Sequence, residues 1–339
     1  MGIPLPAPSD VFADRIRRYR PVVVVLEPTA TGKSAVAVQV AKRYGTEILT
    51  ADSRQVYRGM DIGTDKPSPE ERQGIAHRLI DLVDPDEPYN TGRYRREALE
   101  EIDRMVNAGR LPLVVGGTGL YIRTLIRGMC EAPEADADIR RELMALVAAQ
   151  GREGLYAELV RVDPVTAARL HPNDESKVIR AIEVYRLAGC SLTSLHARHQ
   201  LQSAAFPTLL IGLQRSKESS YRRIEARIDW QLTHGMVEET RTLLARGYSR
   251  ALGSMKGLGY RHLAAQFAGE YDAVEMVRRF KQDTRQFAKR QMTWFRKEPG
   301  IVWLMIDAEE STSHTADRVV ELVEQFMASL GTRRAQSVS

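Results

Sequence analysis

The chain has 339 residues, enough for one large domain or two moderate ones with a substantial core. It is 43% hydrophobic and 27% charged, as globular proteins are, and no apolar run is long enough to cross a bilayer. The net charge of +5 favours a nucleic-acid partner without establishing one. Cys130 and Cys190 lack metal-ligand spacing, so neither zinc nor a disulfide is indicated and we expect a cytoplasmic protein.

The segment from Pro21 to Tyr44 reads as a strand, a loop and a helix. Val22 to Leu26 is a continuous apolar run, and Lys33 to Tyr44 carries apolar residues at helical spacing. Backbone N–H groups of the intervening turn would face an anion at the helix N-terminus. We therefore predict a loop that binds the phosphates of a di- or triphosphate through Pro28, Thr29, Ala30, Thr31, Gly32, Lys33 and Ser34, the Ser34 hydroxyl also coordinating Mg²⁺.

Glu27 is the one departure from the loop pattern G-x-x-x-x-G-K-[ST], which has glycine at its first position. A carboxylate facing an anionic ligand would repel it by about 4 kcal/mol, for unit charges about 4 Å apart at an effective dielectric constant near 20. The side chain could point away to solvent or to an arginine, or it could help hold Mg²⁺. We expect the loop to survive with a weakened affinity for diphosphate.

Further strands and helices alternate along the chain, which predicts an α/β fold: a P-loop parallel sheet flanked by helices. The strands are expected at 47–50, 77–83, 111–115, 207–213 and 301–306, and the helices at 94–108, 221–244, 272–296 and 311–330. Residues 135–204 show only amphipathic helical patterns, so they are expected to form an all-α insertion domain. The core would then comprise residues 20–134 and 205–331, followed by a disordered tail at 332–339.

Two polar residues, Asp52 and Thr118, follow predicted strands. Because ligands of parallel sheets bind beyond the carboxyl ends of the strands, both should lie in one cleft with the phosphate loop. By position alone, Asp52 could instead cap the turn after its strand, and Thr118 could cap the following helix.

Basic residues gather in two segments. Residues 281–297 hold six basic side chains against the single acid Asp283, with aromatic residues between them. This is typical of an RNA-binding helix or simply of a solvated helix face. Arg15, Arg17, Arg18 and Arg20 form a second cluster, near an N-terminus that we expect to be mobile, and we assign it no role.

Several blocks of sequence are distinctive in combination: EPTATGKS at 27–34, DSRQVY at 52–57, DIGTDKP at 61–67, GGTGLY at 116–121, ND at 173–174 with RAIEVY at 180–185, and KRQMTWFR at 289–296. In this order, from about residue 22 to 303, they resemble the bacterial tRNA dimethylallyltransferase (isopentenyltransferase) family. The resemblance implies transfer of a dimethylallyl group from its diphosphate to N6 of the adenosine at tRNA position 37, beside the anticodon.

The resemblance also implies roles for residues. Asp52 would be the base that accepts the N6 proton, Thr118 would bind at the reacting centre, and Arg223 would reach the diphosphate, with Mg²⁺ as cofactor. Position alone would make Arg223 a surface ion-pair partner. The anticodon stem-loop of tRNA would be contacted by Asp52, Ser53, Arg54, Gln55, Arg140, Arg180, Lys289, Arg290, Gln291, Trp294 and Arg296.

Three alternatives stay open at this stage. An adenylate isopentenyltransferase would act on free AMP, ADP or ATP, but would need neither the insertion nor the basic segment. A P-loop small-molecule kinase would need an arginine-rich lid, which we do not find in the sequence. Because of Glu27, a catalytically weakened RNA-binding protein is the third. We expect a monomer that does not bind membranes.

Overall fold

The computed structural model describes residues 9–29, 31–129, 132–199 and 206–332. Ala30 of the predicted phosphate loop, Cys130 and residues 333–339 of the predicted tail lie outside these ranges. The chain forms two compact units, one made of residues 1–126 and 206–339 and the other of residues 127–205. The first unit therefore contains both the predicted phosphate loop and the basic segment.

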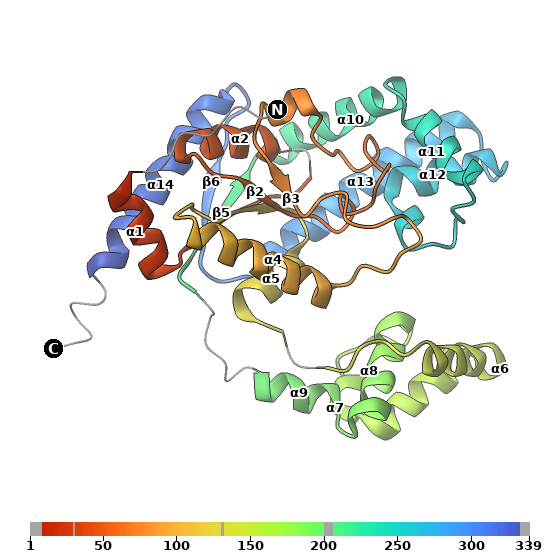
Figure 1. The fold of residues 1–339 in the computed structure, drawn as a ribbon. Helices are drawn as coiled ribbons and strands as arrows, with labels where there is room; N and C mark the ends of the chain where they lie inside the picture. Colours follow the sequence, from red (N-terminus) through yellow and green to blue (C-terminus); the bar gives the residue numbers. More distant parts are fainter. Residues whose placement is uncertain (1–8, 30, 130–131, 200–205, 333–339) are drawn as a thin grey trace. The chain divides into compact units, whose positions relative to one another are not determined.

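The first unit is built on a six-stranded sheet whose neighbouring strands all pair in parallel (Figure 1). The strand order is β3-β2-β4-β1-β5-β6. The strands are β1 (Val22–Leu26), β2 (Ile48–Ala51), β3 (His77–Arg78), β4 (Leu113–Gly116), β5 (Thr208–Gln214) and β6 (Ile301–Met305). Since β1 lies between β4 and β5 and all its residues are buried, it forms the centre of the hydrophobic core. The predicted α/β class is confirmed.

Helices cover both faces of this sheet. Figure 1 shows α2 (Lys33–Tyr44) and α14 (Thr312–Thr332) on one side and α4 (Thr91–Asn107) on the other. Three further helices, α10 (Lys217–Thr233), α12 (Leu258–Phe267) and α13 (Ala273–Phe295), pack together around a second apolar cluster that includes Ile228 and Phe280. The other helices of this unit are α1 (Asp10–Tyr19), α3 (Pro69–Arg72), α5 (Gly119–Arg127), α11 (Met236–Ala245) and the short 3₁₀ helix η1 (Ser254–Lys256).

The second unit has a small core of its own. Leu143, Leu155, Val178 and Ile182 are buried against one another. Each described element of this unit is a helix: α6 (Ala137–Val162), α7 (Pro164–Ala167), α8 (Glu175–Ala188) and α9 (Leu192–His199). In α6, Gly151 interrupts the helical backbone with a positive φ of 70°.

The structure differs from the sequence-based expectation in several places. Residues 10–19, for which we predicted no helix or strand, form α1, whose Ile16 is fully buried. Strand β3 ends at Arg78 instead of Val83, because Leu79 and Asp81 take left-handed backbone conformations that end the strand. The helix predicted from 221 to 244 is two helices, separated where Gly235, with a φ of 105°, immediately precedes α11.

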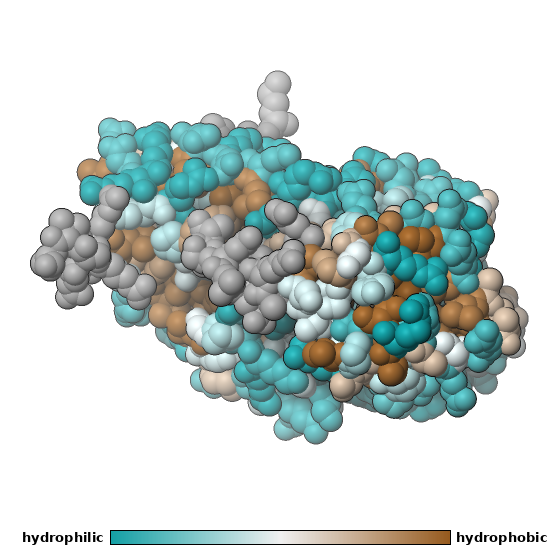
Figure 2. Space-filling view, turned by 90° about the horizontal axis from the view of Figure 1, so that it is seen from below, coloured by the Kyte–Doolittle hydropathy of each residue, from teal (hydrophilic) through white to brown (hydrophobic). Residues whose placement is uncertain are grey.

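The surface carries no large apolar belt on the face shown in Figure 2, where hydrophilic side chains alternate with small hydrophobic patches. Among the described helices, none combines the length and the apolar character that a membrane crossing requires.

Candidate functional site

The carboxyl ends of three neighbouring strands meet at one cavity of about 250 Å³. Glu27 follows β1, Asp52 follows β2, and Gly117 and Thr118 follow β4; all four line the cavity. Side chains from α10, α12 and α13 complete its walls. The structure thus brings the phosphate loop together with Asp52 and Thr118, as predicted for a site beyond the strand ends.

The loop after β1 leads into α2 with the geometry of a phosphate cradle. Gly32 precedes the helix with a φ of 109°, a conformation that glycine adopts without strain. The Thr31 hydroxyl donates to the carbonyl of Pro28 at 2.8 Å and so closes the loop on itself. Since no side chain caps α2, the first amides of the helix are open to an anion in the cavity, except at Lys33.

The Glu27 side chain is folded into this loop. It is 1% exposed, and its Oε1 accepts a hydrogen bond from the Lys33 N–H at 3.0 Å and lies 3.7 Å from Lys33 Nζ. Its Oε2 is buried and has no hydrogen-bond partner. Burial raises the pKa of this carboxyl, while the charge and the amide of Lys33 act in the opposite direction. The alternative that Glu27 points to solvent is therefore wrong.

Three arginines surround the loop. Arg215 Nε donates to the carbonyl of Thr31 at 2.9 Å, and a Cβ placed on Gly32 would lie 3.5 Å from Arg223 Nη2. Burial and the neighbouring Arg223 lower the pKa of the Arg215 guanidinium. Arg227 donates to the Thr29 hydroxyl at 2.6 Å and pairs with Asp65. Such a concentration of guanidinium groups is suited to a polyanion such as a diphosphate.

Two of these arginines, Arg215 and Arg227, were not among the predicted site residues. Arg227 follows Arg223 by four positions, which places both on one face of α10, so helical spacing could have identified it. Arg215 directly follows β5, where the rule of ligands at strand ends also applies.

Asp52 uses its two carboxylate oxygens differently. Oδ1 accepts hydrogen bonds from the backbone N–H groups of Arg54 at 2.8 Å and Gln55 at 3.4 Å, which is the turn-capping role. No residue that the structure describes donates a hydrogen bond to Oδ2. Because Asp52 lines the cavity, Oδ2 can accept a proton or a hydrogen bond from a ligand there.

Thr118 holds the ends of β2 and β4 together. Its hydroxyl oxygen accepts from the Ser53 N–H at 3.0 Å, and its own N–H donates to the carbonyl of Ala51 at 3.1 Å. The strands approach so closely here that a Cβ on Gly116 would lie 2.1 Å from the Ala51 carbonyl oxygen. The hydroxyl therefore sits at a fixed place in the cavity wall, next to Asp52.

Gln291 of α13 connects two loops of the site. Its Oε1 accepts from the Thr29 N–H at 3.0 Å, and its Nε2 donates to the Gly117 carbonyl at 2.9 Å. Gln55, also predicted to contact tRNA, is buried and donates to the carbonyls of Thr64 and Asp65. Both side chains therefore have a structural role inside the site, and their contact with tRNA stays a prediction.

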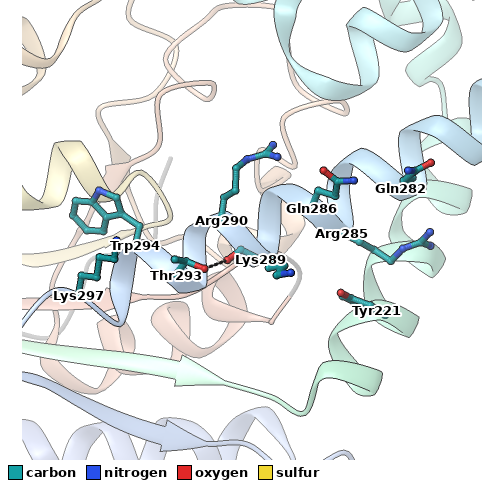
Figure 3. A pocket seen from close by; sticks show the side chains of 9 residues that line it. All are labelled: Tyr221, Gln282, Arg285, Gln286, Lys289, Arg290, Thr293, Trp294 and Lys297. Carbon is teal, nitrogen blue, oxygen red and sulfur yellow. Dashed lines mark hydrogen bonds between the residues drawn. The ribbon is translucent and has the colours of Figure 1, made fainter. Parts of the chain in front are cut away.

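A basic groove of about 720 Å³ lies along α13 (Figure 3). Figure 3 shows Arg285, Lys289 and Arg290 distributed along the helix, Lys297 beyond its end, and Tyr221 of α10 at the opposite end of the groove. Of the predicted tRNA contacts, Trp294 also lines the groove, where its ring stacks under the Arg123 guanidinium. Arg296, beyond the end of α13, is exposed and does not line it. Ser53 and Arg54 lie at the mouth of the other cavity, near Asp52.

Arg140 and Arg180 belong to the second unit, where both pair with the fully buried Glu183. Arg140 donates from Nε to Oε1 at 2.8 Å, and Arg180 donates from Nη1 to Oε2 at 2.5 Å. Burial acts to raise the pKa of Glu183, but the hydrogen bonds from these arginines outweigh it and the pKa is lowered. Arg140 thus joins α6 to α8, whereas Arg180 pairs within α8 and also donates to the carbonyl of Pro133 at 2.6 Å.

The site offers oxygen donors that suit Mg²⁺. The Ser34 hydroxyl and the Asp52 carboxylate line a small second cavity beside α2, and Glu27 Oε2 is buried without a partner. Within the described ranges, no group of three or more His, Cys, Asp or Glu side chains could hold a metal ion. A magnesium ion here would consequently take most of its ligands from phosphate oxygens and water.

Comparison with known proteins gives a consistent result. The IPP transferase family model matches residues 55–298, and an isopentenyl transferase model matches residues 21–85. The chain is 44% identical to tRNA dimethylallyltransferase 2 of Geotalea uraniireducens over 88% of this chain and 96% of the relative. It is 46% identical to tRNA dimethylallyltransferase of Geobacter metallireducens, over 84% and 92%.

Solved structures agree with these relatives. The chain matches the tRNA isopentenylpyrophosphate transferase of Bacillus halodurans with a TM-score of 0.68 at 33% identity, over 92% of this chain and 99% of that one. It matches a eukaryotic dimethylallyltransferase acting on tRNA with a TM-score of 0.80 at 27% identity, over 91% and 80%. The chain belongs to the IPP transferase family, whose curated relatives are tRNA dimethylallyltransferases.

Proposed function

We propose that the protein transfers the dimethylallyl group of dimethylallyl diphosphate to N6 of the adenosine at tRNA position 37, beside the anticodon, and releases diphosphate. The observation that carries the proposal is that a phosphate loop, an open carboxylate oxygen and a threonine hydroxyl line one cavity. The family supports the same reaction, since its curated relatives are named for it. We infer that it acts as a monomer in the cytoplasm, where its tRNA substrate would be found.

The reaction joins N6 of adenine to C1 of the allyl group as the C1–O bond breaks. The leaving diphosphate takes the electron pair of that bond, so negative charge grows on the phosphates. Lys33, Arg223 and Arg227 surround the place where that charge would develop and would stabilise it. A bound Mg²⁺, held by Ser34 and by the phosphates, would supply further charge stabilisation.

The amine needs a proton acceptor, because an exocyclic amine conjugated to a purine is a weak nucleophile. Asp52 lines the cavity, and its Oδ2 would accept the N6 proton while Oδ1 stays bound to the backbone. The adenine must leave its stack to reach this oxygen, as in other enzymes that modify a base. The apolar part of the cavity, which includes Ile228, Leu258 and Phe287, would receive the dimethylallyl group.

The basic groove along α13 is the proposed surface for the tRNA backbone. Its four cationic side chains would contact phosphates, while Trp294 and Tyr221 offer aromatic faces for unstacked bases.

Incubation of the protein with dimethylallyl diphosphate and either unmodified tRNA or AMP tests the proposal. Mass measurement of the nucleosides should show one added dimethylallyl group on the adenosine of tRNA and none on AMP. Modification of AMP alone would support a free-nucleotide enzyme instead. Modification of neither, with tRNA still bound, would favour a weakened RNA-binding protein.

A further inference from the structure

The phosphate loop of this chain already contains an acidic side chain of its own. Glu27 Oε1 accepts the hydrogen bond of the Lys33 N–H, the first amide of α2. That amide belongs to the cradle that holds a phosphate in loops of this type, because unsatisfied donors and the helix dipole both point there. The carboxylate also takes the nearest cation, since Lys33 Nζ lies 3.7 Å from the same oxygen.

The position of the carboxylate is not imposed by backbone strain. Glu27 is not among the described non-glycine residues with a positive φ, so its backbone conformation is open to any residue. The Cβ is therefore compatible with the turn, and what distinguishes this loop is the charge that the side chain places in it.

Oε2 shows that the carboxylate is poorly satisfied where it lies. Oε2 is buried in the wall of the cavity without a hydrogen-bond partner, and the whole residue is only 1% exposed. A buried acceptor left unpaired is costly. Two positive and one negative side chain act on this carboxyl, namely Lys33, Arg227 and Asp65. Arg227 is itself committed to Asp65 and to the Thr29 hydroxyl, so Lys33 is its one direct ion-pair partner in the described ranges.

We propose that the Glu27 carboxylate occupies the phosphate position at the start of α2 when no substrate is bound, and that a diphosphate must displace it in order to bind. The proposal rests on the proposed function, because it assumes that the diphosphate uses this loop. Residue 27 then sets the affinity for the substrate and, equally, for the diphosphate product. Ligands that do not use the Lys33 amide, tRNA among them, are unaffected.

Inorganic diphosphate with Mg²⁺ is the probe, titrated calorimetrically into the wild type, Glu27→Gly and Glu27→Gln. The Gly variant should bind it tighter by about threefold to thirtyfold, the range expected when a like charge is removed from a partly buried helix terminus. The Gln variant keeps the length and an acceptor oxygen but not the charge, so its affinity should lie between the other two. Inhibition of the transfer reaction by diphosphate should strengthen in the same order.

A merely structural role for Glu27 gives a different pattern. If the side chain only held the loop together, both variants would lose thermal stability and would bind diphosphate more weakly, whereas displacement predicts tighter binding. Equal affinity of all three proteins would overturn the displacement and leave the proposed function intact. If neither the wild type nor Glu27→Gly bound diphosphate while tRNA binding persisted, the assignment of the loop and this inference would both fall.

Discussion

Replacing Asp52 by asparagine separates the two roles that its carboxylate combines. Asparagine can keep a carbonyl oxygen where Oδ1 caps the turn at Arg54 and Gln55, so the turn should survive. At the other position it presents an NH₂ group in place of Oδ2, and this group cannot accept a proton from the amine.

The expected effect is on the chemical step. Loss of a positioned general base costs about 10²–10⁴-fold in rate, which corresponds to about 3–5 kcal/mol of transition-state stabilisation. A single-turnover assay, with saturating dimethylallyl diphosphate and tRNA, should show this loss directly. Binding of both substrates, measured separately, should stay within about twofold, since one hydrogen-bond acceptor replaces another at the turn.

Asp65→Asn is the matched control, because Asp65 lines the same cavity but pairs with Arg227. Loss of the Asp65 charge should alter the binding of diphosphate and leave the single-turnover rate at saturating substrates nearly unchanged. Single turnover by the Asp52→Asn protein within about threefold of the wild type would refute the assignment of Asp52 as the base.

Three further outcomes are expected. Gln291→Ala removes two hydrogen bonds and leaves two backbone groups unpaired, so diphosphate affinity should fall about tenfold, more than any loss of tRNA affinity measured by filter binding. Replacing both Lys289 and Arg290 by glutamine should reduce the slope of log K for tRNA against log salt by about 0.7–0.9 per lost phosphate contact, and an unchanged slope would make this a solvated helix face. Glu183→Gln should lower the free energy of unfolding by about 1.5–3 kcal/mol, the contribution of one hydrogen bond to a charged group. Because the pKa of Glu183 is depressed in the folded protein, its stabilisation should be present above about pH 4.5 and lost as the pH falls below that value. Acid titration of the wild type, followed by circular dichroism, measures this loss.

Strong periodic patterns made the sheet predictable, whereas local backbone conformations did not follow from sequence. The apolar run of β1 and the alternation of strands and helices indicated that the core is a parallel sheet flanked by helices. The end of β3 depends on left-handed conformations at Leu79 and Asp81; leucine gives no signal of such a conformation, and aspartate, although enriched in it, adopts it in only a minority of cases. The split between α10 and α11 did have a signal in Gly235, which the continuous helical pattern outweighed.

How much of the site could be predicted from the sequence was limited by the directions of its side chains. Placing Asp52, Thr118 and Lys33 together required only the rule that ligands bind beyond strand ends. The inward fold of Glu27 depends on burial and on its pairing with Lys33, and such tertiary contacts do not follow from residue spacing. Arg227 lay within reach of the sequence, since the i, i+4 relation to Arg223 placed it on the same helix face.

The basic segment shows how a contiguous motif divides between two sites once it is helical. Neighbouring residues of a helix point in directions about 100° apart, so one face of α13 carries Phe280, Thr284, Phe287 and Gln291 into the cavity beside the phosphate loop. Several residues between them line the basic groove, namely Gln282, Arg285, Gln286, Lys289 and Arg290. Gln291 and its neighbours look like one tRNA-binding motif in sequence because the motif is continuous, yet Gln291 bonds the two loops that enclose the proposed diphosphate site. A single rigid helix therefore fixes the distance between the surface proposed for the tRNA backbone and the cavity proposed for the reacting adenine, and this is why substitutions one or two residues apart are expected to affect different substrates.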